Sequence, residues 1–230
     1  TAVNTHGVKI NTITATDWLE TGGDVESIVA PSIAKIKVAG SRTLAIDGDF
    51  QVDLDLSGAE TGLTLGSASI AGQASGEWTV NGSTGAVTVG STDATFRFTC
   101  AGQVKGFASN DALLGAYSAA SFDKISAKGL VTADITASGV GTSGGKAIGT
   151  FTGGSVVDTT ISATAGGIGS LTALEWTDAD GDVDLATDWI GSLKMTGRSA
   201  NARAGLDAVA GDFGADMTLS GEDAPRGKVL

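Results

Sequence analysis

Four aspartates in one short, glycine-containing stretch form the strongest chemical motif of the chain. The alternate positions of DADGDVD are Asp178, Asp180, Asp182 and Asp184. Ca²⁺ takes about six to eight oxygen ligands in flexible geometry, so alternate carboxylates in a turn can converge on one such ion, as in the first half of calcium loops. The glycine usual at the sixth loop position is replaced by Val183, and Trp189 stands where a bidentate glutamate is usual. A structural Ca²⁺ site and a solvated turn both stay open as interpretations.

Other candidates for site chemistry are few. The chain has one histidine, His6, and one cysteine, Cys100, so a Ser–His–Asp or Cys–His arrangement has a single candidate base. The same count excludes zinc sites built from His and Cys ligands. Cys100 lies in an alternating apolar stretch and is expected to be a small core residue. We therefore expect that the chain is not an enzyme and has no catalytic residues.

A column of carboxylates recurs at matching positions of three related segments, at Asp53, Asp134 and Asp216. Each lies on the polar side of its segment, and the copies are separated by at least one full repeat unit. The column is therefore expected to face solvent or to bind a neighbouring backbone amide. A second carboxylate follows in the first copy only, so a glycosidase-type carboxylate pair is not a property of the repeat.

The segments that carry this column belong to an internal repeat of short predicted strands. Aligned on their closing glycines, they read DFQVDLDLSG (49–58), LVTADITASG (130–139) and DFGADMTLSG (212–221). A second set precedes them and reads SIAKIKVAG (32–40), SFDKISAKG (121–129) and WIGSLKMTG (189–197). Apolar residues alternate with polar ones in both sets, which is typical of strands with one buried face.

The repeats predict a single repetitive domain over residues 1–230, with no linker composition dividing it. Its parts are a partial unit (1–31), two full units of unequal loop length (32–120 and 121–188) and a second partial unit (189–230). Two interpretations of the open ends remain: covalent continuation in a longer chain, or contact with other subunits.

Composition favours an all-β fold of the parallel β-helix, or β-solenoid, type. The chain has 35 Gly, 2 Pro and 41% hydrophobic residues, and glycines stand at nearly every expected strand end, where they allow tight corners. A repeat of about 70 to 90 residues is too long for one coil, so each unit is expected to contain about two to four. The alternative is a tandem β-sandwich, which also has short strands at regular spacing.

The charge balance bears on the class of partner. With 14 Lys and Arg against 26 Asp and Glu, the formal net charge is −12, and an acidic surface repels phosphate backbones. The sequence has no apolar stretch of the roughly 18 residues that a membrane-spanning helix needs. Nucleic-acid binding and membrane insertion are therefore not expected.

The chain resembles the glycine-rich repetitive regions of very large bacterial surface and secreted proteins. The resemblance is carried by the repeated strands, by the segment LTLGSASIAG (63–72) and by the acidic Trp-containing loops. This resemblance implies an extracellular or cell-surface location, a rod-like or fibrous scaffold and frequent calcium binding. It implies no catalytic residues.

The expected function is that of a structural extracellular protein, a repeat module of a surface scaffold, filament or adhesive fibre. End-to-end self-association and covalent continuation are the two expected modes of extension. The alternative is a carbohydrate-binding or polysaccharide-degrading β-helix with a glycan as partner. Trp18 and Trp176 hold matching places in the repeat, where they either pack beside a loop or stack on sugar rings.

Overall fold

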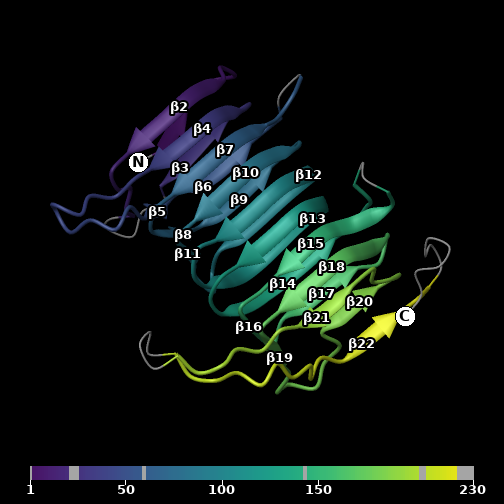
Figure 1. Cartoon of the computed structure of the whole chain (residues 1–230). Helices are drawn as coiled ribbons and strands as arrows, with labels where there is room; N and C mark the ends of the chain where they lie inside the picture. Colours follow the sequence, from purple (N-terminus) through teal and green to yellow (C-terminus); the bar gives the residue numbers. More distant parts are fainter. Residues whose placement is uncertain (1, 21–25, 59–60, 142–143, 202–205, 222–230) are drawn as a thin grey trace.

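The computed structural model describes residues 2–20, 26–58, 61–141, 144–201 and 206–221. In these residues the chain is all-β, and every ladder between named strands is parallel. Successive coils stack along one axis, with the first and last coils at opposite ends of the stack (Figure 1). The fold is therefore a parallel β-solenoid of about nine turns, which confirms the predicted β-helix and excludes the tandem β-sandwich.

The coils contribute strands to two long faces, and five of them also contribute a strand to a short face. The first face consists of β1 (Ala2–Asn4), β3 (Ser27–Ala30), β6 (Asp53–Leu56), β9 (Glu77–Val80), the first halves of β12 (Arg97–Ser109) and β13 (Leu113–Ala127), β14 (Val131–Ala137), β17 (Thr160–Ala163), β20 (Leu185–Thr187) and β22 (Met217–Leu219). The second face consists of β2 (Ile10–Ala15), β4 (Ile33–Val38), β7 (Leu65–Ile70), β10 (Thr84–Val89), the second halves of β12 and β13, β15 (Lys146–Thr152), β18 (Gly167–Ala173) and β21 (Leu193–Met195). The short face consists of β5 (Phe50–Gln51), β8 (Gln73–Ser75), β11 (Ser91–Thr92), β16 (Ser155–Val157) and β19 (Glu175–Thr177).

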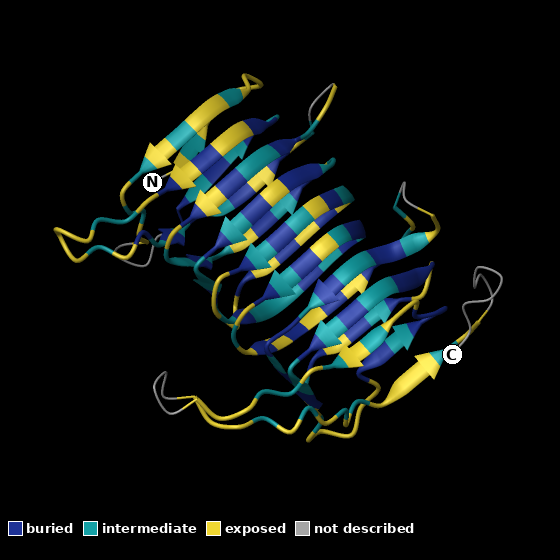
Figure 2. Cartoon of the chain, viewed as in Figure 1, coloured by how far each residue is buried: buried dark blue, intermediate teal, exposed yellow. Residues whose placement is uncertain are grey.

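The apolar columns of the sequence repeat are inward-facing columns of the solenoid. One such column on the first face runs through Val3, Ile28, Leu54, Trp78, Phe98, Tyr117, Ile135, Ile161, Leu185 and Met217. Side chains alternate in direction along a strand, so period-two alternation leaves one side of every strand in the core. Except in the end coils, the inward residues are buried (Figure 2).

The two full repeat units differ by one whole coil. Four coil steps separate Ile33 from Phe122, and three separate Phe122 from Ile190. Their unequal length therefore arises from an added coil as well as from loops. The part of the last unit after residue 221 lies outside the described residues.

Aromatic side chains fill the core where the coils are shortest. The coil from Tyr117 to Ile135 spans 18 residues, whereas that from Leu185 to Met217 spans 32. Edge-to-face or tilted ring contacts with centroids 5.0–6.4 Å apart connect Phe50, Trp78, Phe96, Phe98, Phe107 and Tyr117. Such ring pairs contribute about 0.5–1.5 kcal/mol each beyond their buried area. Cys100 is buried in this region, as its alternating neighbours predict.

Glycines recur at one irregular position of the second face. Two residues, instead of one, separate the inward side chains of Ile33 and Ile36, and the same pattern repeats between Leu65 and Ala68. At the first of these two places five of the seven following coils have a glycine, namely Gly66, Gly85, Gly149, Gly169 and Gly191. The other two have Lys105 and Asp123. A Cβ atom at Gly85 would overlap the carbonyl oxygen of Gly66 in the preceding coil. Glycine thus allows neighbouring coils to approach at this bulge.

We expect Gly85→Ala to lower the free energy of unfolding by about 1–3 kcal/mol, because the added methyl must push two coils apart. Gly106→Ala is the matched control on the same face, since a Cβ there has its nearest neighbour, the Lys124 carbonyl oxygen, at 4.0 Å. The control should change stability by less than about 1 kcal/mol. Urea unfolding of both variants measures the difference, and equal losses would contradict the close-approach explanation.

Candidate functional site

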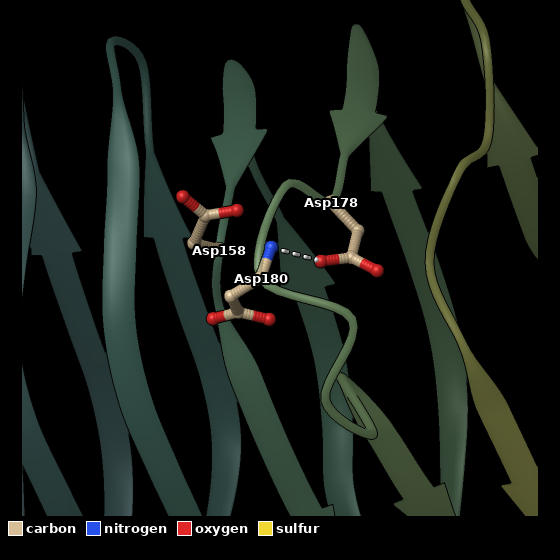
Figure 3. A group of neighbouring side chains, drawn as sticks. All are labelled: Asp158, Asp178 and Asp180. Atoms are coloured by element: carbon tan, nitrogen blue, oxygen red, sulfur yellow. Dashed lines mark hydrogen bonds between the residues drawn. The ribbon is translucent and has the colours of Figure 1, made fainter.

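The carboxylates of Asp158, Asp178 and Asp180 form an acidic cluster at one corner of the solenoid (Figure 3). Asp158 follows β16, and the other two follow β19 in the next coil. One ligand oxygen from each residue lies within 4.8 Å of those of the other two. Oδ1 of Asp178 accepts hydrogen bonds from the N–H groups of Asp180 (3.0 Å) and Gly181 (3.1 Å), so the loop turns back on itself. Three carboxylates from two coils therefore converge.

The four predicted ligands do not all reach this cluster. Asp182 is exposed, and its N–H donates to Oδ1 of Asp180 at 3.0 Å. Asp184 is buried at 3% exposure, and its Oδ2 accepts a 3.0 Å hydrogen bond from the N–H of Asp216 in the next coil. Asp178 and Asp180 are thus the two predicted ligands that the structure places in the cluster.

Asp158 is the member of the cluster that sequence reasoning missed. It precedes Asp178 by one coil, so no local spacing connects the two residues. Its Oδ1 accepts a 2.8 Å hydrogen bond from the N–H of Ala179, which ties the two loops together. Its backbone has a φ of +42°, in the left-handed region that non-glycine residues rarely adopt. Only the fold brings this side chain to the loop.

The pKa values of the aspartates at the two ends of the acidic loop are shifted in opposite directions, downward for Asp178 and upward for Asp184. The N–H of Gly181 is the main cause that holds the pKa of Asp178 below its usual value, because it stabilises the charged carboxylate. Burial raises the pKa of Asp184, and the charges of Asp178, Asp180 and Asp216 raise it further, against the lowering effect of the Asp216 N–H. The lowered pKa of Asp178 favours its charged form at the exposed start of the loop, where a hard cation would find an oxygen ligand.

The recurring aspartates of the first face remain separate. Four coil steps lie between Asp53 and Asp134, and three between Asp134 and Asp216. Oδ1 of Asp53 accepts the N–H of Glu77 in the next coil at 2.7 Å, the bond to a neighbouring amide that the sequence analysis expected. These residues do not form a carboxylate pair.

The surface also has shallow depressions. One lies on the first face around Arg97 and Asp134, where two adjoining hollows have volumes of about 270 and 210 Å³. Another, of about 380 Å³ on the same face, is lined by Asp53, Asp55 and Glu77. A third, of about 580 Å³, lies at a corner near Lys9 and Pro31.

The rings that border the Arg97 depression, those of Phe98 and Tyr117, are buried in the core and do not offer a face to a sugar. This depression does combine a cation, carboxylates and hydroxyl groups.

The two matching tryptophans contact aromatic rings of the coil stack, with Trp18 half-buried in the first coil and Trp176 fully buried. Trp18 makes an edge-to-face contact with Phe50 at 5.9 Å, and Trp176 makes one with Phe213 at 6.0 Å. Trp176 is fully buried and also lies against Phe151. Packing is therefore the role of both residues in the fold, and Trp176 is not accessible to a sugar.

No protein-family model matches the chain, and no curated protein or solved structure is significantly similar to it. Among the described residues there is also no helix with the length and hydropathy needed to cross a bilayer. A functional assignment therefore depends on the geometry of the chain itself.

Calcium binding at the acidic cluster stays a prediction, and thermal unfolding tests it. We expect Ca²⁺ to raise Tm, since a ligand at 100 times its Kd stabilises the folded state by about 2.7 kcal/mol. Asp178→Asn removes a charged ligand but keeps an oxygen for the turn, so it should abolish the shift. Asp182→Asn, in the same loop but outside the cluster, should retain it. A Tm that responds to neither Ca²⁺ nor a chelator would contradict the prediction.

Asp184 should make stability depend on pH. Its folded pKa is raised, so folding penalises the ionised form; this penalty is present at neutral pH and disappears below the unfolded value, near 3.8. We expect Asp184→Asn, which keeps an oxygen acceptor for Asp216, to be more stable than wild type at pH 7. The difference should shrink toward zero as the pH falls to about 3. Urea unfolding of both proteins across this range measures it, and a difference that does not change with pH would contradict the prediction.

Proposed function

We propose that this chain is a structural module, a stiff β-solenoid that extends a scaffold or fibre through its end coils. The observation that carries the proposal is the distribution of half-buried apolar residues that pack against the core. In the first coil they form the N-terminal end set: Val3, Ile10, Ile13, Ala15 and Trp18. In the last coils they form the C-terminal end set: Leu193, Met195, Phe213, Ala215 and Leu219. Among the described residues, the inward columns are thus covered throughout the interior and less completely covered in the end coils.

The surface between the ends supports the same proposal. The outward column of the second face is made mostly of small or hydroxyl side chains, among them Ser69, Thr88, Ala108, Ser126, Thr152 and Thr172. Such a face, with parallel ladders on both sides of every interior coil, is compatible with a regular rod. An extracellular or cell-surface location is part of the proposal and rests on the sequence resemblance to repetitive surface proteins.

A second candidate function is glycan binding or cleavage at the depression around Arg97 and Asp134. The observation that favours it is the combination of a guanidinium, a carboxylate and the neighbouring hydroxyls of Thr99, Ser118 and Thr136. Its two adjoining hollows, of about 270 and 210 Å³, are each small for a ligand site.

A polysaccharide assay combined with proteolysis separates the two functions. For a structural module, we expect coils that resist protease and no release of reducing ends from any polysaccharide tested. Release that is lost in Asp134→Asn and retained in Asp182→Asn would overturn the structural proposal in favour of the glycan one. Asp182 is the control, because it is exposed and lines none of the surface depressions around Arg97, Asp53 or Lys9.

A further inference from the structure

The second face carries most of the lysines of an otherwise acidic chain. Six of the nine lysines lie in its strands, together with a single carboxylate, that of Asp123. The six are Lys35, Lys37, Lys105, Lys124, Lys146 and Lys194, and all except the half-buried Lys146 are exposed. The strands of the first face have the opposite balance, with four carboxylates and one cation, Arg97. Charge is therefore divided between the two long faces, although the net charge of the chain is −12.

The ammonium groups of these six lysines have no partner in the described part of the chain. No hydrogen bond or ion pair engages any of them there, whereas Lys128, in a corner, donates to Oδ1 of Asn110 at 2.9 Å. Many carboxylates, in contrast, accept hydrogen bonds within the fold, as Asp49 and Asp53 do from backbone N–H groups of the next coil. The carboxylate of Asp123 accepts one from Nε2 of Gln103. The fold thus employs its carboxylates and leaves the second-face lysines available to an external anion.

Three of the lysines form a central lysine group in successive coils: Lys105 on β12, Lys124 on β13 and Lys146 on β15. Lys105 and Lys124 lie between the same two inward columns of adjacent strands. Lys124 pairs in turn with Thr150 of β15, the strand that begins at Lys146. Neighbouring strands are about 4.8 Å apart, so like charges on them repel each other. An anion bound between these groups would relieve the repulsion.

The acidic first face does not cancel the charge of the second face for a ligand in solution. The Debye length at physiological ionic strength is about 8 Å, and exposed charges farther apart than this are largely screened from each other. Two packed sheets lie about 10 Å apart, and the outward side chains of both add to the distance between the faces. A ligand on the second face therefore responds mainly to the charge of that face.

The surroundings of the lysines indicate the chemistry of the partner. Hydroxyl groups, which both donate and accept hydrogen bonds, flank Lys124 at Ser126 and Thr150, and Thr152, Ser170 and Thr172 continue the same two outward columns. None of the exposed large apolar residues lies in the strands of this face. The face consequently offers cations and hydroxyl groups, without an apolar anchor.

This composition distinguishes between classes of anionic partner. Protein interfaces have an apolar core and are depleted in lysine, so the acidic face of a second copy fits poorly. Surfaces that bind nucleic acids typically use arginine and stacked aromatic side chains. The described second-face strands have no arginine, and their aromatic residues, Phe107, Phe122 and Phe151, are buried. A hydrophilic polymer with both hydroxyl and anionic groups matches the face better than either.

We propose that the second face binds a linear acidic polysaccharide, a polyuronate with one carboxylate on each sugar, which lies across the coils. Lysine ammonium groups bind the carboxylates, and the serine and threonine hydroxyls bind the hydroxyl groups of the sugars. Seven coil steps separate Lys35 from Lys194, about 34 Å at 4.8 Å for each coil. One charge on each sugar fits this sparse spacing better than dense sulfation does. The inference goes beyond the proposed structural function and does not depend on it.

Isothermal titration calorimetry with polygalacturonate tests the inference. A chelator is included, so that Ca²⁺ cannot connect the polymer to the acidic cluster. We expect binding at about 0.15 M NaCl that is lost at about 1 M, where the Debye length is about 3 Å. Dextran, a neutral polysaccharide, should not bind. Absence of polygalacturonate binding at millimolar sugar concentration would overturn the inference.

Charge reversals on and off the face test the site. Lys124→Glu should weaken binding about tenfold or more, because a charge-assisted hydrogen bond is replaced by repulsion. Lys124→Gln, which removes the charge without reversing it, should weaken binding by a smaller factor. Arg42→Glu is the matched control, because Arg42 is exposed in the loop after β4 and outside the second-face strands. It changes the net charge by the same amount and should retain binding. Far-UV circular dichroism verifies that each variant folds.

Three further outcomes would overturn the inference. Equal weakening by Lys124→Glu and Arg42→Glu would show a response to net charge and not to the face. Weakening by Arg97→Glu that Lys124→Glu does not show would place the sugar in the Arg97 depression of the first face. Tighter binding of a single-stranded oligonucleotide than of polygalacturonate, at the same salt concentration, would make the partner a nucleic acid.

Discussion

The parallel ladder between successive coils is the constraint on which the rest of the structure depends. Coils of 18 to 32 residues all return to the same register, so their differences in length are confined to corners and loops. Each inward side chain consequently lies on the inward side chain of the preceding coil, and the core is a set of columns. Interior strands of the two long faces have ladder partners on both sides, whereas the outermost strands have one, which makes the ends chemically different from the middle.

At the corners between strands the ladder of backbone hydrogen bonds stops, so other hydrogen bonds must connect neighbouring coils there. At several of them a carboxylate takes over and accepts the N–H of the next coil, as Asp49 and Asp53 do. Part of the acidic composition is thus structural. The acidic cluster contains the same device, since Asp158 binds the N–H of Ala179 while Asp178 closes its own turn. Hydrogen bonds within the chain therefore help to bring the three carboxylates of the cluster together.

The sequence predicted the strands and their inward sides because alternation directly reports which side of a strand is buried. The columns through Leu54, Ile135 and Met217 were therefore correctly aligned. The coils between them were not visible as repeats, because Trp78, Phe98 and Tyr117 occupy the same column with side chains of different size and shape. Packing of aromatic rings in short coils replaced the aliphatic pattern there.

The acidic site was harder to predict, because its parts come from neighbouring coils. Alternate carboxylates correctly indicated a compact loop, but the chain direction changes within it, and Asp184 turns into the stack. Asp158 enters through coil stacking, which depends on coil length and not on local spacing. Sequence reasoning thus predicted contacts between residues that are close in sequence. Contacts between residues of neighbouring coils depend on the register of the ladder, which the sequence did not reveal.

The two repeat units differ by one coil, which means that the length of such a solenoid along its axis changes in steps of one coil. One coil advances the axis by about 4.8 Å, whatever the number of residues in its loops. Inserting or deleting a coil leaves the faces and the two ends unchanged, provided that the columns re-form. Related chains with more or fewer coils would therefore differ in length along the axis by whole multiples of this step.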